Sequence, residues 1–229
     1  MTCDSVLSKF LTKPMTNTIF LGKSLHVDCC ATTSTCSIVG SLSAPASTME
    51  ELIDTIEKTF SEDTLVTVVV FPGDYGTMEK TYLIPKNVVF FSGESNANTT
   101  IHGNIVLQSF STGMQIKQMT FSQTVTLSEQ TWEAPLGFEN VIFKGAQTQD
   151  KSKTQTIQYK TCTFENPYQM TTFSEGSMDL SFLDCKLNQV HWTLFDRSSI
   201  KARFQDCSVI SLDSEAVSYT HLTLPTTRL

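Results

Sequence analysis

One pattern of apolar positions recurs five times between Met114 and Val209. Each copy reads apolar, any, apolar, any, any, apolar, any, apolar, and successive copies are 22, 21, 23 and 22 residues apart. Apolar residues two apart lie on one face of a β-strand, and the two-residue gap shifts that parity, so each copy predicts two short strands joined by a bend. The columns are Met114, Leu136, Ile157, Leu180 and Ala202; Ile116, Phe138, Tyr159, Phe182 and Phe204; Met119, Val141, Cys162, Cys185 and Cys207; and Phe121, Phe143, Phe164, Leu187 and Val209.

A repeat of this length can pass once around a coil of strands and return one layer higher. Neighbouring layers then lie about 4.8 Å apart and pair as parallel strands. So short a unit cannot bury its own apolar face and depends on the layers above and below it. We therefore predict an all-β fold, a single-stranded right-handed parallel β-helix. The alternative is a sandwich of regularly spaced strands, but no Asn-Gly or Asp-Gly hairpin signal separates the copies.

The segment 47–60 predicts an N-terminal capping α-helix. Ser47 and Glu50 have the spacing of a capping box, and apolar residues such as Leu52 and Ile56 fall on one helical face. The first layer of a coil of strands exposes an apolar core that a terminal unit must cover. We expect this helix to be that cover.

The flanks divide the chain into three parts. Residues 1–46 lack the repeat, and we expect only short strands there, such as 17–21 and 37–42. The β-helix with its capping helix should occupy 47–216. Residues 217–229 begin Val-Ser-Tyr-Thr-His-Leu-Thr-Leu-Pro-Thr, which resembles, residue for residue, the translated adapter of transposon-prepared sequencing libraries. We treat that tail as a sequencing artefact and expect the β-helix to be C-terminally truncated.

Three weaker alignments use an offset of 20 residues. Val68–Asp74 aligns with Val88–Glu94, Ile105 aligns with Val125, and Val190 aligns with Ile210. Runs of Val and Phe without alternation fit strands that are buried on both faces. The polar segment Gln147–Thr156 is expected to form a loop that projects between layers.

Composition and charge bear mainly on function. The 229 residues are 40% hydrophobic, with a formal net charge of -7 and a pI near 5.1. This acidic balance disfavours non-specific nucleic-acid binding, which needs a basic face. No apolar run reaches the ~18 residues of a membrane span. No signal peptide is recognisable, which favours a cytoplasmic or virion location over classical secretion.

The cysteines are odd in number, seven in all. Without an export signal, an odd count favours reduced thiols. Cys162, Cys185 and Cys207 share one column of the repeat, so we expect them to be small buried side chains in the core. Cys29 and Cys30 lack the C-x2-C spacing of a zinc site.

Several segments resemble a known superfamily. After the predicted helix, Val-Val-Val-Phe-Pro-Gly-Asp-Tyr at 68–75, Leu-Ile-Pro-Lys-Asn-Val at 83–88 and Thr-Thr-Ile-His-Gly-Asn at 99–104 look like the opening layers of pectin-lyase-like β-helix proteins. Tyr-Lys-Thr-Cys-Thr-Phe at 159–164 is similar to the generic layer of that superfamily. The resemblance covers about 47–216. It implies a fold and no particular activity, because members range from pectate lyases and polygalacturonases to tailspikes, adhesins and virion proteins.

The catalytic motifs of the enzymatic members are not matched here. Ile101-His102-Gly103 approaches the Gly-His-Gly of polygalacturonases but lacks its first glycine. Asp184 and Asp206 share one column, and two carboxylates stacked about 5 Å apart could bind calcium or raise one pKa. Both also stand at the predicted bend, where Asp closes turns with its own backbone, and we favour that interpretation. We assign no catalytic or metal residue and do not expect an enzyme.

Exposed aromatic side chains are candidates for stacking on sugars. Trp132, Tyr168 and Trp192 are the candidates here, with packing onto the stack as the alternative. We expect a non-catalytic structural or attachment β-helix, such as a virion or surface-fibre component with a carbohydrate-facing surface. Its partners would be polysaccharide or other protein subunits, including copies of itself, and not nucleic acid. The alternative is a polysaccharide lyase or glycoside hydrolase whose active site is incomplete in this sequence.

Overall fold

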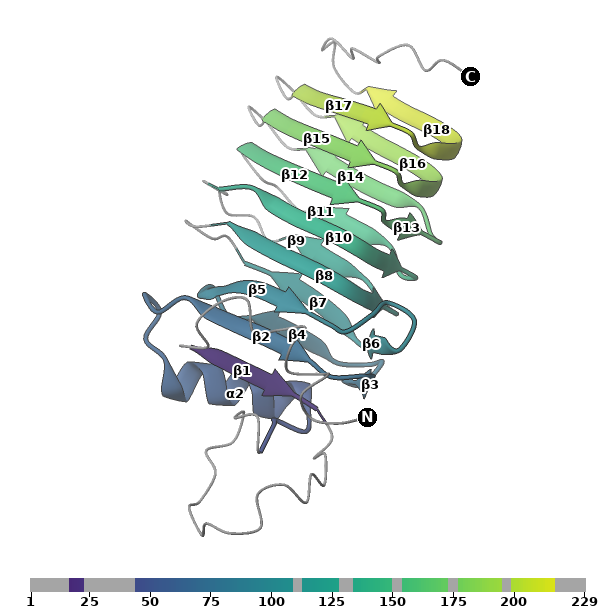
Figure 1. Ribbon diagram of the computed structural model, residues 1–229. Coiled ribbons are helices and arrows are strands. Elements are labelled where there is room, and N and C mark those ends of the chain that lie inside the picture. Colours follow the sequence, from purple (N-terminus) through teal and green to yellow (C-terminus); the bar gives the residue numbers. More distant parts are fainter. Residues whose placement is uncertain are drawn as a thin grey trace, which may run out of the picture.

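The computed structural model is a right-handed coil of parallel strands with an α-helix at one end (Figure 1). Every strand pair in the described part of the chain is parallel, which confirms the predicted β-helix and excludes the antiparallel sandwich. No helix among the described residues is long and apolar enough to cross a membrane. The structure describes residues 17–22, 44–108, 113–127, 134–149, 154–172, 177–194 and 199–216.

Each turn of the coil passes through two or three strands, and the next turn adds strands along the same edges. β1 (Thr18–Leu21) pairs with β2 and precedes α2 (Met49–Thr59). The turns are then β2 (Val66–Val70), β3 (Gly73–Tyr75) and β4 (Thr81–Ile84); β5 (Val88–Ser92), β6 (Thr99–Ile101) and β7 (Asn104–Leu107); β8 (Met114–Phe121) and β9 (Val125–Leu127); β10 (Leu136–Phe143) and β11 (Gln147–Gln149); β12 (Thr154–Lys160), β13 (Thr163–Phe164) and β14 (Tyr168–Thr172); β15 (Ser177–Leu183) and β16 (Lys186–Leu194); and β17 (Ser199–Gln205) and β18 (Ser208–Ala216).

The apolar columns read from the sequence are in register in the fold. Phe138 of β10 pairs with Tyr159 of β12, which pairs with Phe182 of β15, which pairs with Phe204 of β17. Successive rings in this column stack with centroids 5.2, 4.9 and 4.8 Å apart. Because the same ring type recurs at the same position in each turn, the sequence repeat becomes a continuous aromatic stack in the core.

The bend inside each copy is made by one residue in the left-handed backbone region. That conformation breaks the alternation of the strand and lets the apolar pairs on both sides face inward. Asn and Asp adopt it more readily than other non-glycine residues. The residues at this bend are Gln118, Asn140, Thr161, Asp184 and Asp206, with φ of 56°, 56°, 53°, 52° and 54°.

Of the three alignments with an offset of 20, that of Ile105 with Val125 is confirmed and the other two are wrong. Val68 pairs with Phe91, and Val88 pairs with Val66, across a register shift between Val66 and Thr67. Runs of Val and Phe without alternation carry no phase, so sequence alone could not fix their register.

The later alignment fails for a different reason. Val190 pairs with Leu212, because β16 and β18 keep the offset of 22 set by the inward columns. Ile210 is 80% exposed and is not the partner of Val190.

The predicted loop at Gln147–Thr156 is also wrong at both of its ends. Gln147–Gln149 forms β11 and pairs with Val125–Leu127 of β9, and β12 begins at Thr154. Backbone pairing in a ladder does not depend on side-chain polarity, so a polar segment can still continue the stack. Residues 150–153 lie outside the described part.

The capping helix forms, and its first residues differ by one from the prediction. Thr48 is the N-cap, and its hydroxyl accepts a hydrogen bond from the Glu51 backbone N–H at 3.1 Å. The Glu51 carboxylate in turn accepts from the backbone N–H of Ser47 at 2.7 Å. Both Ser47/Glu50 and Thr48/Glu51 have capping-box spacing. The helix begins at Met49, which is buried in the core.

The helix closes the first turn of the coil (Figure 1). Met49, Leu52 and Ile56 are buried against the core, with at most 1% of their surface exposed. β1 adds a parallel strand beside β2 and confirms the short strand predicted at 17–21. The strand predicted at 37–42 and the tail 217–229 lie outside the described residues.

Candidate functional site

Asp184 and Asp206 occupy the left-handed bends of two consecutive turns, and both are exposed. The backbone N–H of Asp184 donates to the carbonyl of Gln205 at 2.9 Å, which continues the ladder through the bend. A calcium ion takes six to eight oxygen ligands. Within the described residues no group of three or more His, Cys, Asp and Glu side chains is arranged to hold a metal ion. The left-handed backbone of both residues supports the turn-forming role for this pair.

The predicted sugar-stacking residues fall in three different situations. Tyr168 is 1% exposed, and its hydroxyl lies 3.3 Å from that of Tyr159, so its ring belongs to the core and cannot stack on a sugar. Burial raises the pKa of Tyr168 well above its ordinary value. The backbone of Trp192 pairs with Met170 and Ser214, and its side chain is not among those described. Trp132 lies outside the described residues.

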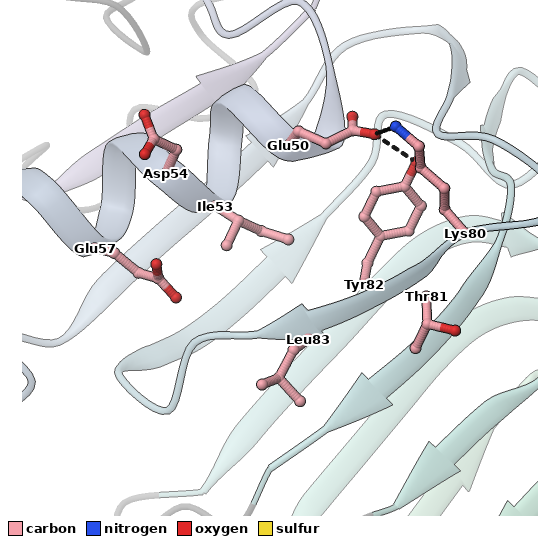
Figure 2. A pocket seen from close by; sticks show the side chains of 8 residues that line it. All are labelled: Glu50, Ile53, Asp54, Glu57, Lys80, Thr81, Tyr82 and Leu83. Carbon is pink, nitrogen blue, oxygen red and sulfur yellow. Dashed lines mark hydrogen bonds and ion pairs between the residues drawn. The ribbon is translucent and has the colours of Figure 1, made fainter.

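A shallow open groove of about 370 Å³ lies between α2 and β4 (Figure 2). Lys80 donates to Glu50 Oε1 at 2.5 Å, and the Tyr82 hydroxyl donates to the same oxygen at 3.3 Å. The hydrogen bond from Lys80 is the main reason why the pKa of Glu50 lies below its ordinary value. These contacts anchor α2 to β4 and to the residue just before it, Lys80. The groove is lined by Glu50, Ile53, Asp54, Glu57, Lys80, Thr81, Tyr82 and Leu83.

A carboxylate, an imidazole and a hydroxyl meet on the surface of three consecutive turns. His102 Nδ1 lies 2.9 Å from Ser122 Oγ, and His102 Nε2 lies 3.4 Å from Asp74 Oδ1. These are the residue types of an acyl-transfer triad, which also needs donors for an oxyanion. The backbone N–H of Ser122 donates to Ile101 O at 3.0 Å, and that of His102 donates to Tyr75 O at 2.7 Å. Both backbone amides are thus used in hydrogen bonds between turns and do not point at an oxyanion site. The three side chains therefore link consecutive turns of the coil.

Sequence reasoning missed this cluster, although the signal was present. His102 and Ser122 each follow directly after a buried residue, Ile101 and Phe121, which pair between β6 and β8. Once those columns are aligned, the two side chains are neighbours. The third member, Asp74, was hidden by the incorrect alignment of the first turns.

A charge ladder runs along the outward face of β8, β10 and β12. Glu139 accepts from Lys117 at 2.7 Å on one side and from Lys160 at 2.7 Å on the other. These two hydrogen bonds, that of Lys117 first, hold the pKa of Glu139 below its ordinary value. The pKa of Lys160 is raised by its hydrogen bond to Glu139. The Lys117 ammonium also lies 5.9 Å from the ring centre of Phe90.

The charge ladder and the His102 cluster share one arrangement, in which each polar side chain contacts a side chain of an adjacent turn. Thr126 of β9 and Thr148 of β11 show the same arrangement, with their hydroxyl oxygens 3.1 Å apart. Comparisons with protein-family models, with curated proteins and with solved structures found no match to this chain.

Proposed function

We propose that this protein is a non-catalytic structural or attachment β-helix, serving in a virion or surface fibre. The main support is the charge ladder of Lys117, Glu139 and Lys160. A hydrolase or lyase directs its charged groups toward the position of a reacting substrate. Here the partly buried carboxylate of Glu139 is held by a lysine above it and a lysine below it. Such pairing rigidifies a scaffold and leaves the central carboxylate without a role as an acid or base.

The resemblance to pectin-lyase-like proteins is part of this proposal. The helix over the first turn, the period near 22 residues and the repeated left-handed bend support it. A shared fold does not carry a shared active site, so the resemblance is compatible with a scaffold.

The outward face of β12, β15 and β17 is the surface proposed for attachment. Gln158 pairs with Ser181, and Ser181 pairs with Arg203, so these side chains form one polar row at about 4.8 Å spacing. Arg203 Nη2 lies 4.0 Å from Asp179 Oδ2, which mixes both charge signs on this face. A flat row of hydrogen-bonding groups suits an extended polysaccharide or the surface of another subunit.

The test compares binding with turnover. The intact protein is passed over immobilised pectate, polygalacturonate and alginate, with and without calcium, and the same polymers are assayed in solution for reducing ends and unsaturated product. We expect retention on at least one polymer, or self-association in sedimentation, without product above a heat-treated control. Loss of retention in Arg203→Ala with Gln158→Ala would assign it to the proposed face. Product formation would contradict the proposal.

The alternative is a polysaccharide lyase or glycoside hydrolase. The observation that favours it is the partly exposed imidazole of His102 between Ser122 and Asp74. The stacked pair Asp184 and Asp206 is its other candidate site. If product appears, His102→Ala and the double change Asp184→Asn with Asp206→Asn decide which group is responsible.

A further inference from the structure

A column of thiols runs through three turns at the bend. Cys162, Cys185 and Cys207 are free cysteines, and each directly follows a left-handed residue of the bend. The strands on both sides of them are in register, since Phe182 pairs with Phe204 and Leu187 pairs with Val209. Cys162 and Cys185 are each 1% exposed, as expected from the sequence, whereas Cys207 is only partly buried.

Each sulfur contacts one backbone carbonyl of its own turn and one of the preceding turn. Cys185 Sγ donates to Leu183 O at 3.3 Å and to Tyr159 O at 3.5 Å. Cys207 Sγ donates to Gln205 O at 3.2 Å and to Phe182 O at 3.4 Å. The two sulfurs therefore have matching orientations and are separated by about one layer. Parallel side chains do not point their sulfurs at each other as a disulfide requires.

This spacing fits a metal bridge. A metal–thiolate bond is about 2.3 Å long, so an ion held linearly between two sulfurs separates them by about 4.6 Å. The layers of the coil repeat at about 4.8 Å. Thiolates select soft ions, whereas a structural zinc site takes four ligands. We propose that Cys185 and Cys207 bind one soft monovalent metal ion, of the Cu(I) or Ag(I) class, in two-coordinate geometry between adjacent turns.

The surroundings of the two sulfurs support this site. Each thiol releases its proton to solvent when the ion binds. The backbone N–H of Cys185 donates to Cys207 Sγ at 3.4 Å, a bond that stabilises a thiolate there. The partial exposure of Cys207 provides the entry path that Cys162 lacks.

The chain offers matched variants for the test. Cys3, Cys29, Cys30 and Cys36 are changed to Ser to remove other thiols, and this background protein is titrated anaerobically with Cu(I) against a chromophoric Cu(I) chelator. Native mass spectrometry counts the bound ions, and ultraviolet thiolate-to-metal absorption reports the ligands. We expect one Cu(I) per chain. Adding Cys207→Ser should abolish it, whereas adding Cys162→Ser should leave it in place.

Circular dichroism and the melting temperature of each metal-free variant check that the coil is intact. Loss of metal binding in a variant can then be distinguished from unfolding. Ag(I) should give the same stoichiometry and the same variant pattern. If the background protein retains no ion, the three thiols serve only in apolar packing and the proposal is overturned. Retention by the Cys207→Ser variant, or loss in the Cys162→Ser variant, would also overturn it. Neither result depends on whether the protein is a scaffold or an enzyme.

Discussion

At the residue scale, the inward rings hold the turns together. Phe143 is 1% exposed and stacks on Phe164 at 4.8 Å and on Phe121 at 5.9 Å. Changing Phe143 to Ala should lower the free energy of unfolding by about 3–5 kcal/mol, the usual cost of emptying a buried aromatic site. The exposed Gln158→Ala should cost less than about 0.5 kcal/mol. Urea unfolding measures both, and equal costs would contradict the inward and outward assignment.

A second residue, Gln147, is polar in an apolar position. It is 2% exposed, between Val125 of one turn and Tyr168 of the next, and its amide makes no well-formed hydrogen bond in the described part, although it interacts with the Tyr159 hydroxyl. A buried unsatisfied polar group costs about 1–3 kcal/mol. Gln147→Leu should therefore raise the free energy of unfolding by about that amount, and Gln158→Leu should not. A clear fall in the urea midpoint for Gln147→Leu would instead show that the amide bonds to a buried group.

The inward positions could be predicted from the sequence because alternation and a constant offset specify them independently. Gln147 could not, since its polarity marks it as a loop residue while its backbone pairs in the ladder. Glu139 has the polarity of a solvated position, and only the register shows that it lies between two lysines. The same holds for His102 and Ser122, whose contact follows from stacking.

At the scale of elements, the charge ladder joins β8, β10 and β12. Because the folded-state pKa of Glu139 is lowered by Lys117 and Lys160, its stabilising contribution is present above about pH 4.3, the ordinary value for Glu. That contribution is lost as the pH falls through the lowered pKa. The pairs are partly exposed, so the effect at neutral pH should be about 1 kcal/mol or less.

The measurement compares the melting temperatures of the unaltered protein and Glu139→Gln from pH 7 to pH 3. The difference between them should be largest near neutrality and should vanish at the acid end. Glu165→Gln, at an exposed position, serves as the control. A difference that stays constant or grows toward acid pH would show that the carboxylate of Glu139 is not stabilised by the lysines.

The capping helix and the groove beside it show where prediction of elements stops. The helix itself followed from its apolar face, but two capping boxes one residue apart were equally compatible with the sequence. In the structure Thr48 is the cap, and Met49 directly after it is buried. The groove depends on the angle at which α2 crosses β4, and no local pattern encodes that angle.

At the scale of the whole molecule, both proposals depend on the register of the stack. The polar row on the attachment face and the sulfur column each require that every turn add one layer directly above the last. Gln115, Gly137, Gln158, Ser181 and Arg203 form one such outward column.

The most direct test measures distances along that column by pulsed electron paramagnetic resonance. Spin labels are placed at Gln115 and Ser181, or at Gln115 and Arg203, in a background in which the seven cysteines are replaced by alanine. Three and four layer spacings place the backbones about 14 and about 19 Å apart. We predict that the second distance is about 5 Å longer than the first. Equal distances, or a shorter second distance, would contradict the stacked register.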